Sequence, residues 1–348
     1  VDIIPTHIQQ GQQTIHHTET QGDYQIFYYR HQQDQDHLRI ERWVHQTTRQ
    51  SHWRVRDAAN TVSIYGRDPS GITQIRDPKE PQRIFSWLLE AQYDERGNVI
   101  QYEYIAENKD NVERQYPFEA KRLQQTQFAQ RYIKRIQYGN TTPWGPDQVE
   151  PTNNDWLFSA VFDYGDHNDV GIPQIQPDRT WPVRQDPYST YSTGFEVRTY
   201  RLCRRIFMFH NFSELPNSSA PIGTIELQYQ ASPIETVLDS ITYTGYRDEQ
   251  GQSWTKSLPP ISCAYATPEQ GDAMLPVEKS LNASLPRGFD EDIQWVDLYG
   301  EGLPGLLTQD DHAWFYQENM GGGRFSARQL VAQKPSCLST SQPLDHSQ

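Results

Sequence analysis

A short acidic turn holds the densest group of chemically capable side chains in the sequence. The segment FDYGDHND brings together Asp163, Asp166, His167 and Asp169. Carboxylates and an imidazole so close together could ligate a metal ion or share acid–base chemistry. Short acidic turns are more often solvated surface loops, so we favour the structural interpretation over the chemical one.

A glycine turn near the C-terminus offers a second possible metal site. The segment DLYGEG places Asp297 and Glu301 around a turn, as calcium loops of the type Asp-x-Asp-Gly-Asp-Gly place their oxygen ligands. Tyr299 stands where such loops carry a second carboxylate, so the affinity for calcium should fall or vanish. We predict a structural β-turn with no metal and no cofactor, and keep Asp297 and Glu301 as weak calcium candidates.

No residue is predicted to be catalytic. The nucleophile motif Gly-x-Ser-x-Gly is absent, and the glycine run 321–323 is not followed by the Lys-Ser/Thr of a phosphate loop. Cys203 lies among arginines that could lower its pKa, but no partner motif accompanies it, which favours a buried structural thiol. His210, beside Phe209 and Phe212, is expected to be a packed histidine rather than a general base.

The cysteines and the glycosylation sequons add no further site. The cysteines are far apart and have no metal-binding spacing; a disulfide between two of them and the redox compartment both stay open. Asn-x-Ser/Thr sequons are expected by chance in an Asn- and Ser-rich β-protein and matter only in a eukaryotic secretory host. The cysteines are Cys203, Cys263 and Cys337, and the sequons begin at Asn140, Asn211, Asn217 and Asn282.

The elements that must position these residues are β-strands, and the stretch 181–210 is central among them. Apolar and polar residues alternate with period two over 195–200 and again over 205–210, which predicts a long strand or a bent strand pair. Four arginines are too many for a closed core, so we expect a large sheet with one wet face and Arg stems lying over aromatic rings. They are Arg198, Arg201, Arg204 and Arg205.

Strands and tight turns alternate through most of the chain. The clearest signal is YDERGNVIQYEY (93–104), a hairpin in which Gly97 supplies positive φ and Asn98 tolerates it. We prefer a strand to a helix for 83–94, and expect a short helix or a long loop within 106–130. Further strands are predicted at 25–30, 37–44, 52–57, 61–66, 131–140, 156–167, 222–230 and 237–248.

The bulk composition supports an all-β protein. The chain has 348 residues, 35% hydrophobic and 12% aromatic, with 20 Tyr and 9 Trp, which suits half-exposed pleated faces. The net charge of −14 disfavours nucleic acid and anionic membranes as partners. No apolar run approaches the length of a transmembrane helix.

Composition also divides the chain into segments. We expect a ragged lead-in over 1–23, a β-domain over 24–260, a Pro-rich linker or strap over 261–287, and a polar tail over 337–348. Residues 288–336 predict three strands, 293–298, 303–308 and 313–317, as part of one β-propeller blade. The chain starts at Val1 with no signal peptide, and we expect a fragment cut at both ends.

Several motifs in order resemble one family. WPVRQDPYSTYSTGFEVRTYRLCRRIFMFHNF, FDYGDH, SLPPI and QWVDLYGEGLPGLL are similar to the SpvB/TcaC N-terminal domain family, found in B components of insecticidal Tc toxin complexes and in SpvB. The Tyr-Asp-x-x-Gly-Asn hairpin also resembles Rhs/YD repeats. The resemblance spans roughly residues 24–336, and its last part is similar to the start of an FG-GAP/VCBS-like propeller.

The resemblance implies a structural role. In the family, the domain builds the wall of a hollow β-shell that holds a cytotoxic C-terminal segment, and catalysis such as ADP-ribosyltransfer lies in a C-terminal domain absent here. The implied partners are the Rhs-type C component and the channel-forming A component of a Tc complex, or the protein's own effector. The implied location is extracellular, after synthesis in the bacterial cytoplasm.

One alternative from a different class remains open. Sheets rich in Tyr and Trp that carry carboxylates can bind or cleave sugars, and Asp163 with Glu196 would be the first pair to test. Two carboxylates about 5 to 10 Å apart in a groove with exposed Trp would favour this carbohydrate-binding or carbohydrate-active protein.

Overall fold

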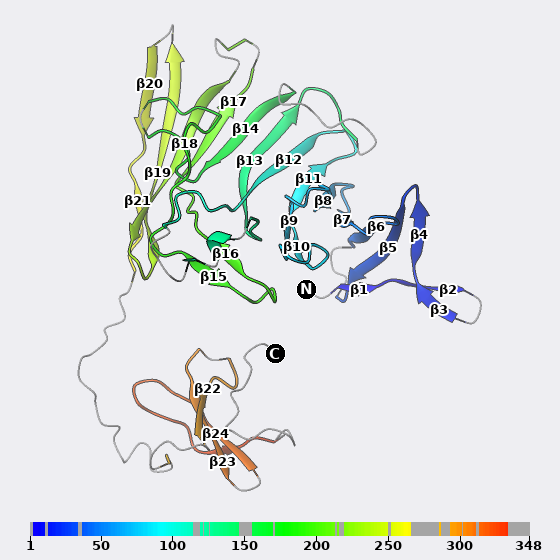
Figure 1. Ribbon diagram of the computed structural model, residues 1–348, viewed down its shortest axis with the longest axis vertical. Helices are drawn as coiled ribbons and strands as arrows, with labels where there is room; N and C mark the ends of the chain where they lie inside the picture. The colour runs from blue at the N-terminus through cyan, green and yellow to red at the C-terminus, as the bar shows by residue number, and fades with distance from the viewer. Residues whose placement is uncertain are drawn as a thin grey trace. The chain divides into compact units, whose positions relative to one another are not determined.

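The computed structural model describes most of the chain (Figure 1). The described residues are 3–10, 13–33, 37–113, 119–120, 122–124, 126–145, 155–169, 171–212, 214–215, 219–249, 252–265, 285–286, 293–300, 302–310 and 313–332. The chain separates into two compact units, residues 1–265 and 266–348. No helix in the described ranges is long and apolar enough to cross a membrane.

A 15-stranded antiparallel sheet dominates the first unit, which confirms the predicted all-β fold with a large sheet of hairpins. Strands adjacent in sequence are mostly adjacent in space, and Figure 1 shows the strand direction turning from β20 at one end to β4 at the other. The strands are β1 (Ile3–Pro5), β4 (Thr18–Gln21), β5 (Tyr24–His31), β6 (Arg39–His45), β7 (Ser51–Arg56), β8 (Val62–Tyr65), β11 (Leu89–Tyr93), β12 (Val99–Ala106), β13 (Arg131–Asn140), β14 (Trp156–Asp163), β17 (Arg205–His210), β18 (Ala220–Ala231), β19 (Thr236–Glu249), β20 (Gln252–Ser257) and β21 (Ile261–Ser262).

Each edge of this sheet is formed by two short strands that pair with the same neighbouring strand. At one end β1 and β4 pair with successive parts of β5, and the hairpin of β2 (His7–Gln10) and β3 (Gln13–His16) leaves the sheet between them. Figure 1 shows this hairpin projecting from the end of the sheet. At the other end β20 and β21 pair with successive parts of β19, with Pro259 and Pro260 between them. The predicted ragged lead-in is therefore ordered into four strands over its described residues.

The buried apolar residues form small clusters, as the low hydrophobic content allows. One cluster beneath β8, β11 and β12 includes Ile64, Val99 and Trp156, and others surround Trp43, Tyr164 and Phe207. Alternate residues of the strands contribute to each cluster, as Ile26 and Tyr28 of β5 do. Stability is thus distributed along the sheet.

Two segments are divided between sheets: 83–94, for which one strand was predicted, and 195–210, for which a long strand or a bent strand pair was predicted. Residues 83–94 split at Leu88 into β10 (Ile84–Trp87), which pairs with β9 (Gln74–Arg76), and β11 of the main sheet. Residues 195–210 split into β16 (Val197–Thr199), which pairs with β15 (Tyr188–Thr190), and β17 of the main sheet. The second case is the bent pair, and Figure 1 shows β15 and β16 below the strands β13 and β14 of the main sheet.

The turn residues of the sequence predicted the β11–β12 hairpin, but not every detail of its turn. Gly97 has φ +82° in the predicted β11–β12 hairpin, but Asn98 does not share the positive φ. Asp94 closes this turn instead, because its carboxylate accepts from the backbone N–H groups of Arg96 and Asn98, both at 2.9 Å. Within 106–130 the described helix is one 3-10 turn, η2 (Arg122–Gln124). The predicted turn after 248 lies partly outside the described residues.

The second unit contains a four-stranded antiparallel meander. Its strands are β22 (Ile293–Val296), β23 (Gly305–Asp310), β24 (Ala313–Gln317) and β25 (Gln329–Leu330), in that order. Val296, Leu307, Trp314 and Tyr316 form its core. The sequence predicted three of these strands, at 293–298, 303–308 and 313–317, and the β-propeller blade stays a prediction. The linker residues 266–284 and 287 and the tail 337–348 lie outside the described residues.

Candidate functional site

The acidic turn is positioned by three neighbouring strands. Asp163 ends β14, directly opposite Arg205 of β17, and the chain turns at once so that Asp166 and His167 face back toward β13. The carboxylate of Asp163 is fully buried and accepts from Arg205 Nε at 2.6 Å and from the backbone N–H of Gly165 at 2.7 Å. The turn predicted to be solvated is therefore mostly buried, because basic side chains from adjacent strands neutralise its carboxylates.

A lysine ammonium group stands within this turn. Lys134 Nζ, from β13, donates to Asp166 Oδ2 at 2.7 Å and to the Phe162 carbonyl at 3.0 Å, and lies 3.2 Å from His167 Nε2. Burial, followed by the charge of Lys134, lowers the pKa of His167, which favours the neutral imidazole. Burial acts to raise the pKa of Asp166, but its hydrogen bond to Lys134 and that cation's charge outweigh burial and lower it.

The contacts of Lys134 and Arg205 with the acidic turn determine whether the turn could hold a metal ion. Asp163, Asp166 and His167 place one ligand atom each within 4.8 Å of one another, the one such group in the described part of the chain. Lys134 and Arg205 already provide the positive charge that a metal ion would bring, and both are within hydrogen-bonding distance of the carboxylates. The donor set therefore fits a pair of structural ion pairs better than a cation site.

Asp163 and Glu196 have no partner in common. Glu196, in the β15–β16 hairpin, accepts on Oε1 from Arg122 Nε at 2.7 Å, Ser189 Oγ at 2.7 Å and Tyr191 OH at 2.9 Å. Partial burial would raise the pKa of Glu196, but these donors outweigh it and hold the pKa below its ordinary value. A carboxyl group that stays ionised is a poor general acid, so Glu196 is poorly suited to that role in a glycosidase.

The other residues selected from the sequence are also engaged in packing or hydrogen bonding. Burial, followed by the nearby charge of Asp163, raises the pKa of Cys203 to about 12, which makes its thiol unreactive. His210 lies edge-on to Phe158 and Phe212, with ring centroids 5.2 and 5.1 Å away. Asp297 Oδ2 accepts from the Gly302 N–H at 2.7 Å. Glu301 lies outside the described residues.

The remaining sequence features have structural roles where they are described. The amide oxygen of Asn140 accepts from the Val99 N–H at 2.8 Å, and Asn211 Nδ2 donates to Ser159 Oγ at 2.9 Å. Residues 321–323 have φ values of +72°, +59° and +72°, as a glycine turn requires. Asn217, Asn282 and Cys337 lie outside the described residues.

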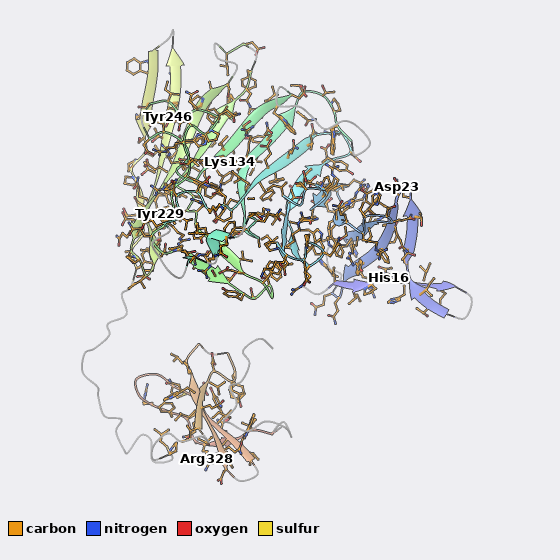
Figure 2. The ribbon with its side chains drawn as sticks, in the orientation of Figure 1. His16, Asp23, Lys134, Tyr229, Tyr246 and Arg328 are labelled. Atoms are coloured by element: carbon orange, nitrogen blue, oxygen red, sulfur yellow. The ribbon has the colours of Figure 1, made fainter. Side chains whose placement is uncertain are left out.

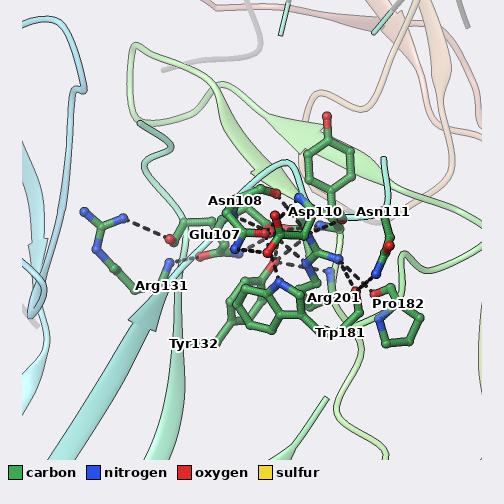
Figure 3. A network of polar contacts seen from close by, with 12 residues as sticks. Glu107, Asn108, Asp110, Asn111, Arg131, Tyr132, Trp181, Pro182 and Arg201 are labelled. Carbon is green, nitrogen blue, oxygen red and sulfur yellow. Dashed lines mark hydrogen bonds and ion pairs between the residues drawn. The ribbon is translucent and has the colours of Figure 1, made fainter. Parts of the chain in front are cut away.

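An extensive buried polar network was not anticipated from the sequence (Figure 3). The side chains of Arg201 and Glu107 are completely buried, and Arg201 Nε donates to Glu107 Oε1 at 2.9 Å. The guanidinium also donates to the carbonyls of Asn108, Asp110, Trp181 and Pro182 and lies 4.6 Å from the Trp181 ring. One arginine therefore joins the segments 107–110 and 181–182 to the end of β16.

The carboxylate of Glu107 is fully satisfied as well. Its Oε2 accepts from Tyr132 OH at 2.5 Å and from the Tyr200 N–H at 2.8 Å, and its Oε1 also accepts from the Asn108 N–H. Burial, followed by the charge of Glu107, raises the pKa of Tyr132, so the phenol remains a donor. A second buried carboxylate, Glu119, accepts from Arg198 and from Tyr200 OH.

The prediction of a wet arginine face was wrong for two of the four arginines. Arg198 and Arg201 are 6% and 2% exposed, because each is paired with a buried glutamate from the segment 107–119. The predicted stacking on aromatic rings is confirmed, since Arg198 lies over Tyr200 and Arg205 over Phe207. No spacing rule in the sequence could have paired glutamates and arginines so far apart.

Comparison with known proteins assigns the chain to a family. The family model described as "Salmonella virulence plasmid 65kDa B protein", SpvB, matches residues 1–212. The chain belongs to the SpvB family. This confirms the resemblance to the SpvB/TcaC N-terminal domain.

The full-length SpvB relatives are longer than this chain. Mono(ADP-ribosyl)transferase SpvB of Salmonella typhimurium is 31% identical over 235 residues, which are 65% of this chain and 38% of that protein. The solved N-terminal domain of SpvB from S. typhimurium strain LT2 is 30% identical, with a TM-score of 0.62 over 70% of this chain and 78% of that one.

Tc toxin structures match nearly the whole chain. A chain in the crystal structure of TcdB2-TccC3-Cdc42 is 28% identical with a TM-score of 0.74, over 99% of this chain and 16% of that one. A chain of the Photorhabdus luminescens Tc holotoxin pore is 30% identical with a TM-score of 0.67, over 97% and 16% respectively. The SpvB-family fold described here is thus found within larger toxin components.

Proposed function

We propose that this chain is a non-enzymatic wall segment of a bacterial toxin shell. The shell would enclose a cytotoxic C-terminal effector and deliver it after export from the producing bacterium. Its partners would be Tc-type subunits, an Rhs-like C component and a channel-forming A component, or the protein's own effector domain.

The observation that carries the proposal is the match across 99% of this chain to 16% of a toxin-complex chain. A fold that occupies so small a share of a larger component is suited to act as one panel of an assembly. The wide sheet with dispersed apolar clusters also suits a wall, which has to span area rather than enclose one thick core.

The state of the candidate catalytic groups supports the non-enzymatic part. Asp163 and Glu196 are each held by arginines, and burial makes Cys203 a poor nucleophile. Any transferase activity would then lie in a further domain of the longer protein. The carbohydrate-active alternative has less support, because its two carboxylates have separate sets of partners.

The shell proposal is tested on the full reading frame that encodes this segment, produced together with its C-type subunit. We expect hollow particles by electron microscopy, and an effector segment that resists protease until the particles are opened with denaturant. A solid or open particle, or an effector cleaved as fast inside the complex as alone, contradicts the proposal.

The non-enzymatic part is tested on the 348-residue chain. We expect no transfer of ADP-ribose from labelled NAD to a cell lysate and no release of reducing sugar from a polysaccharide panel. Turnover that is lost on Asp163→Asn or Glu196→Gln, with the far-UV circular dichroism spectrum unchanged, would overturn it.

A further inference from the structure

Two adjoining hollows form a trough on the face of strands β17, β18 and β19. The first has a volume of about 500 Å³ and the second about 290 Å³, and they share Pro173 and Tyr246. Together they reach the size of ordinary ligand pockets. Figure 2 places Tyr229 and Tyr246 along this side of the sheet. The trough adjoins the acidic turn, because Asp169 and Arg205 line the first hollow.

Hydrogen bonds within the wall fix its shape. Thr224 Oγ1 donates to Tyr246 OH at 3.1 Å, and Tyr229 OH donates to the Cys203 carbonyl at 2.8 Å. Arg205 is held by Asp163 at 2.6 Å with its guanidinium over Phe207. The floor is therefore preorganised, which lowers the entropy cost of binding a ligand.

The first hollow is polar without net charge. Its charged residues are two arginines, Arg204 and Arg205, and two acids, Asp169 and Glu226. Gln185 adds an exposed carboxamide, which can both donate and accept hydrogen bonds, and Gln228 Nε2 donates to Glu226 Oε1 at 2.5 Å. This balance suits an uncharged ligand that itself carries donors and acceptors, as a peptide backbone does.

The second hollow is more apolar than the first, although Gln174, Ser219 and Arg247 also line it. Ile172, Ile175, Phe209 and Pro221 contribute to its lining, and Ile172 is 43% exposed. These side chains suit an apolar side chain of a ligand. A sugar ring prefers an exposed flat aromatic platform with polar groups around it, and Phe209 is only 2% exposed. An apolar anchor beside a hydrogen-bonding surface is the usual pattern of peptide recognition.

We propose that this trough binds an uncharged, extended peptide segment, with one apolar side chain at the Ile172 end and the backbone and polar side chains at the Gln185 end. The inference rests on the proposed function only for the natural source of the peptide, a segment of the enclosed effector. The chemistry of the trough is independent of that source.

The test measures fluorescence anisotropy of the 348-residue chain with labelled ten-residue peptides. Each peptide contains one Leu and one Ser-Asn pair in a background of Gly, Ser and Thr. The distance between the Leu and the pair varies across the series from two to five positions. We expect the best Leu peptide to bind about tenfold more tightly than its Leu→Ser partner, as burial of one Leu side chain implies. Replacing its Ser-Asn pair by Glu-Glu or by Lys-Lys should weaken binding about equally.

Two variants and one matched control locate the binding. Ile172→Ser and Gln185→Ala should each weaken the Leu peptide at least about threefold, whereas Ile234→Ser should not, because Ile234 is 91% exposed at the β18–β19 turn and outside the trough. Circular dichroism and melting temperature would confirm that all three variants fold. Equal affinity for Leu and Ser peptides, or equal loss in Ile172→Ser and Ile234→Ser, would overturn the proposal.

Two further outcomes would assign the trough to a different occupant. Binding of neutral oligosaccharides that Ile172→Ser abolishes, with no peptide binding, would identify a saccharide site. Self-association that depends on Ile172 would identify a second copy of the chain. Either result overturns the peptide site but leaves the shell proposal intact. If electron microscopy showed solid particles while the peptides bound as expected, the shell proposal would be overturned and the peptide site would stand.

Discussion

The substitution Glu107→Gln tests the buried network most directly. The replacement keeps the side-chain volume and the Oε1 acceptor for Arg201 and Asn108, but places an NH2 group against the Tyr200 N–H, 2.8 Å from Oε2. It also leaves the Arg201 guanidinium, completely buried, without a counter-charge. We therefore expect the first unit to lose stability while keeping its fold.

The size of the loss follows from the burial of the pair. Breaking a buried ion pair by changing one partner costs about 3–5 kcal/mol. Backbone carbonyls still accept from both Nη atoms of Arg201, which favours the lower end, about 3 kcal/mol. With a denaturant slope of about 3 kcal/mol per molar urea, the midpoint should fall by about 1 M.

The assay is urea unfolding followed by tryptophan fluorescence, because Trp181 lies against Arg201. Glu95→Gln, an exposed carboxylate in the β11–β12 turn, is the matched control and should shift the midpoint by less than about 0.2 M. A shift that small for Glu107→Gln would refute the reasoning. The double variant Glu107→Leu with Arg201→Met should cost less than the two single changes added together, since no lone charge remains.

Three further outcomes follow from other parts of the first unit. Burial, followed by the charge of Arg54, lowers the pKa of His52 from 6.5 to about 3. The neutral imidazole's contribution to stability is therefore full above pH 6.5 and declines as the pH falls toward 3. The free energy of unfolding should fall between pH 7 and pH 5 by about 2 kcal/mol more in the wild type than in His52→Gln. Gly97→Ala should lower the melting temperature more than Gly22→Ala: both positions have positive φ, but a Cβ at 97 would lie 2.8 Å from the Trp144 backbone nitrogen and one at 22 would meet nothing; equal effects would contradict this steric argument. At pH 8 a thiol reagent should label Cys263 well before Cys203, whose pKa is raised by burial, and similar rates by mass spectrometry would show that Cys203 is accessible.

The strands could be predicted because their information is local. In 93–104 the alternation of side chains, the aspartate and the glycine all lie within one hairpin, and the structure forms it with Gly97 at positive φ. The division of 83–94 at Leu88 could not be predicted, since both halves alternate and only their pairing partners differ. Local pattern gives a strand, whereas its sheet depends on contacts made elsewhere in the chain.

The polar interior could not be predicted for the same reason. Arg201 and Glu107 are 94 positions apart, and neither belongs to a recognisable motif. Four arginines in a short stretch are typical of a solvated surface. The prediction of a solvated face is wrong for Arg198 and Arg201 because glutamates from another segment neutralise them. The acidic turn at Asp163 is the converse case, since its bases come from neighbouring strands.

The composite edges of the main sheet have a consequence for how the protein behaves in concentrated solution. An unbroken outer strand would be a template for uncontrolled association into fibrils. Here a projecting hairpin interrupts one border, and two residues without N–H donors interrupt the other. A foreign strand would therefore find only short stretches of free edge to pair with, so association through the borders of this broad sheet is disfavoured.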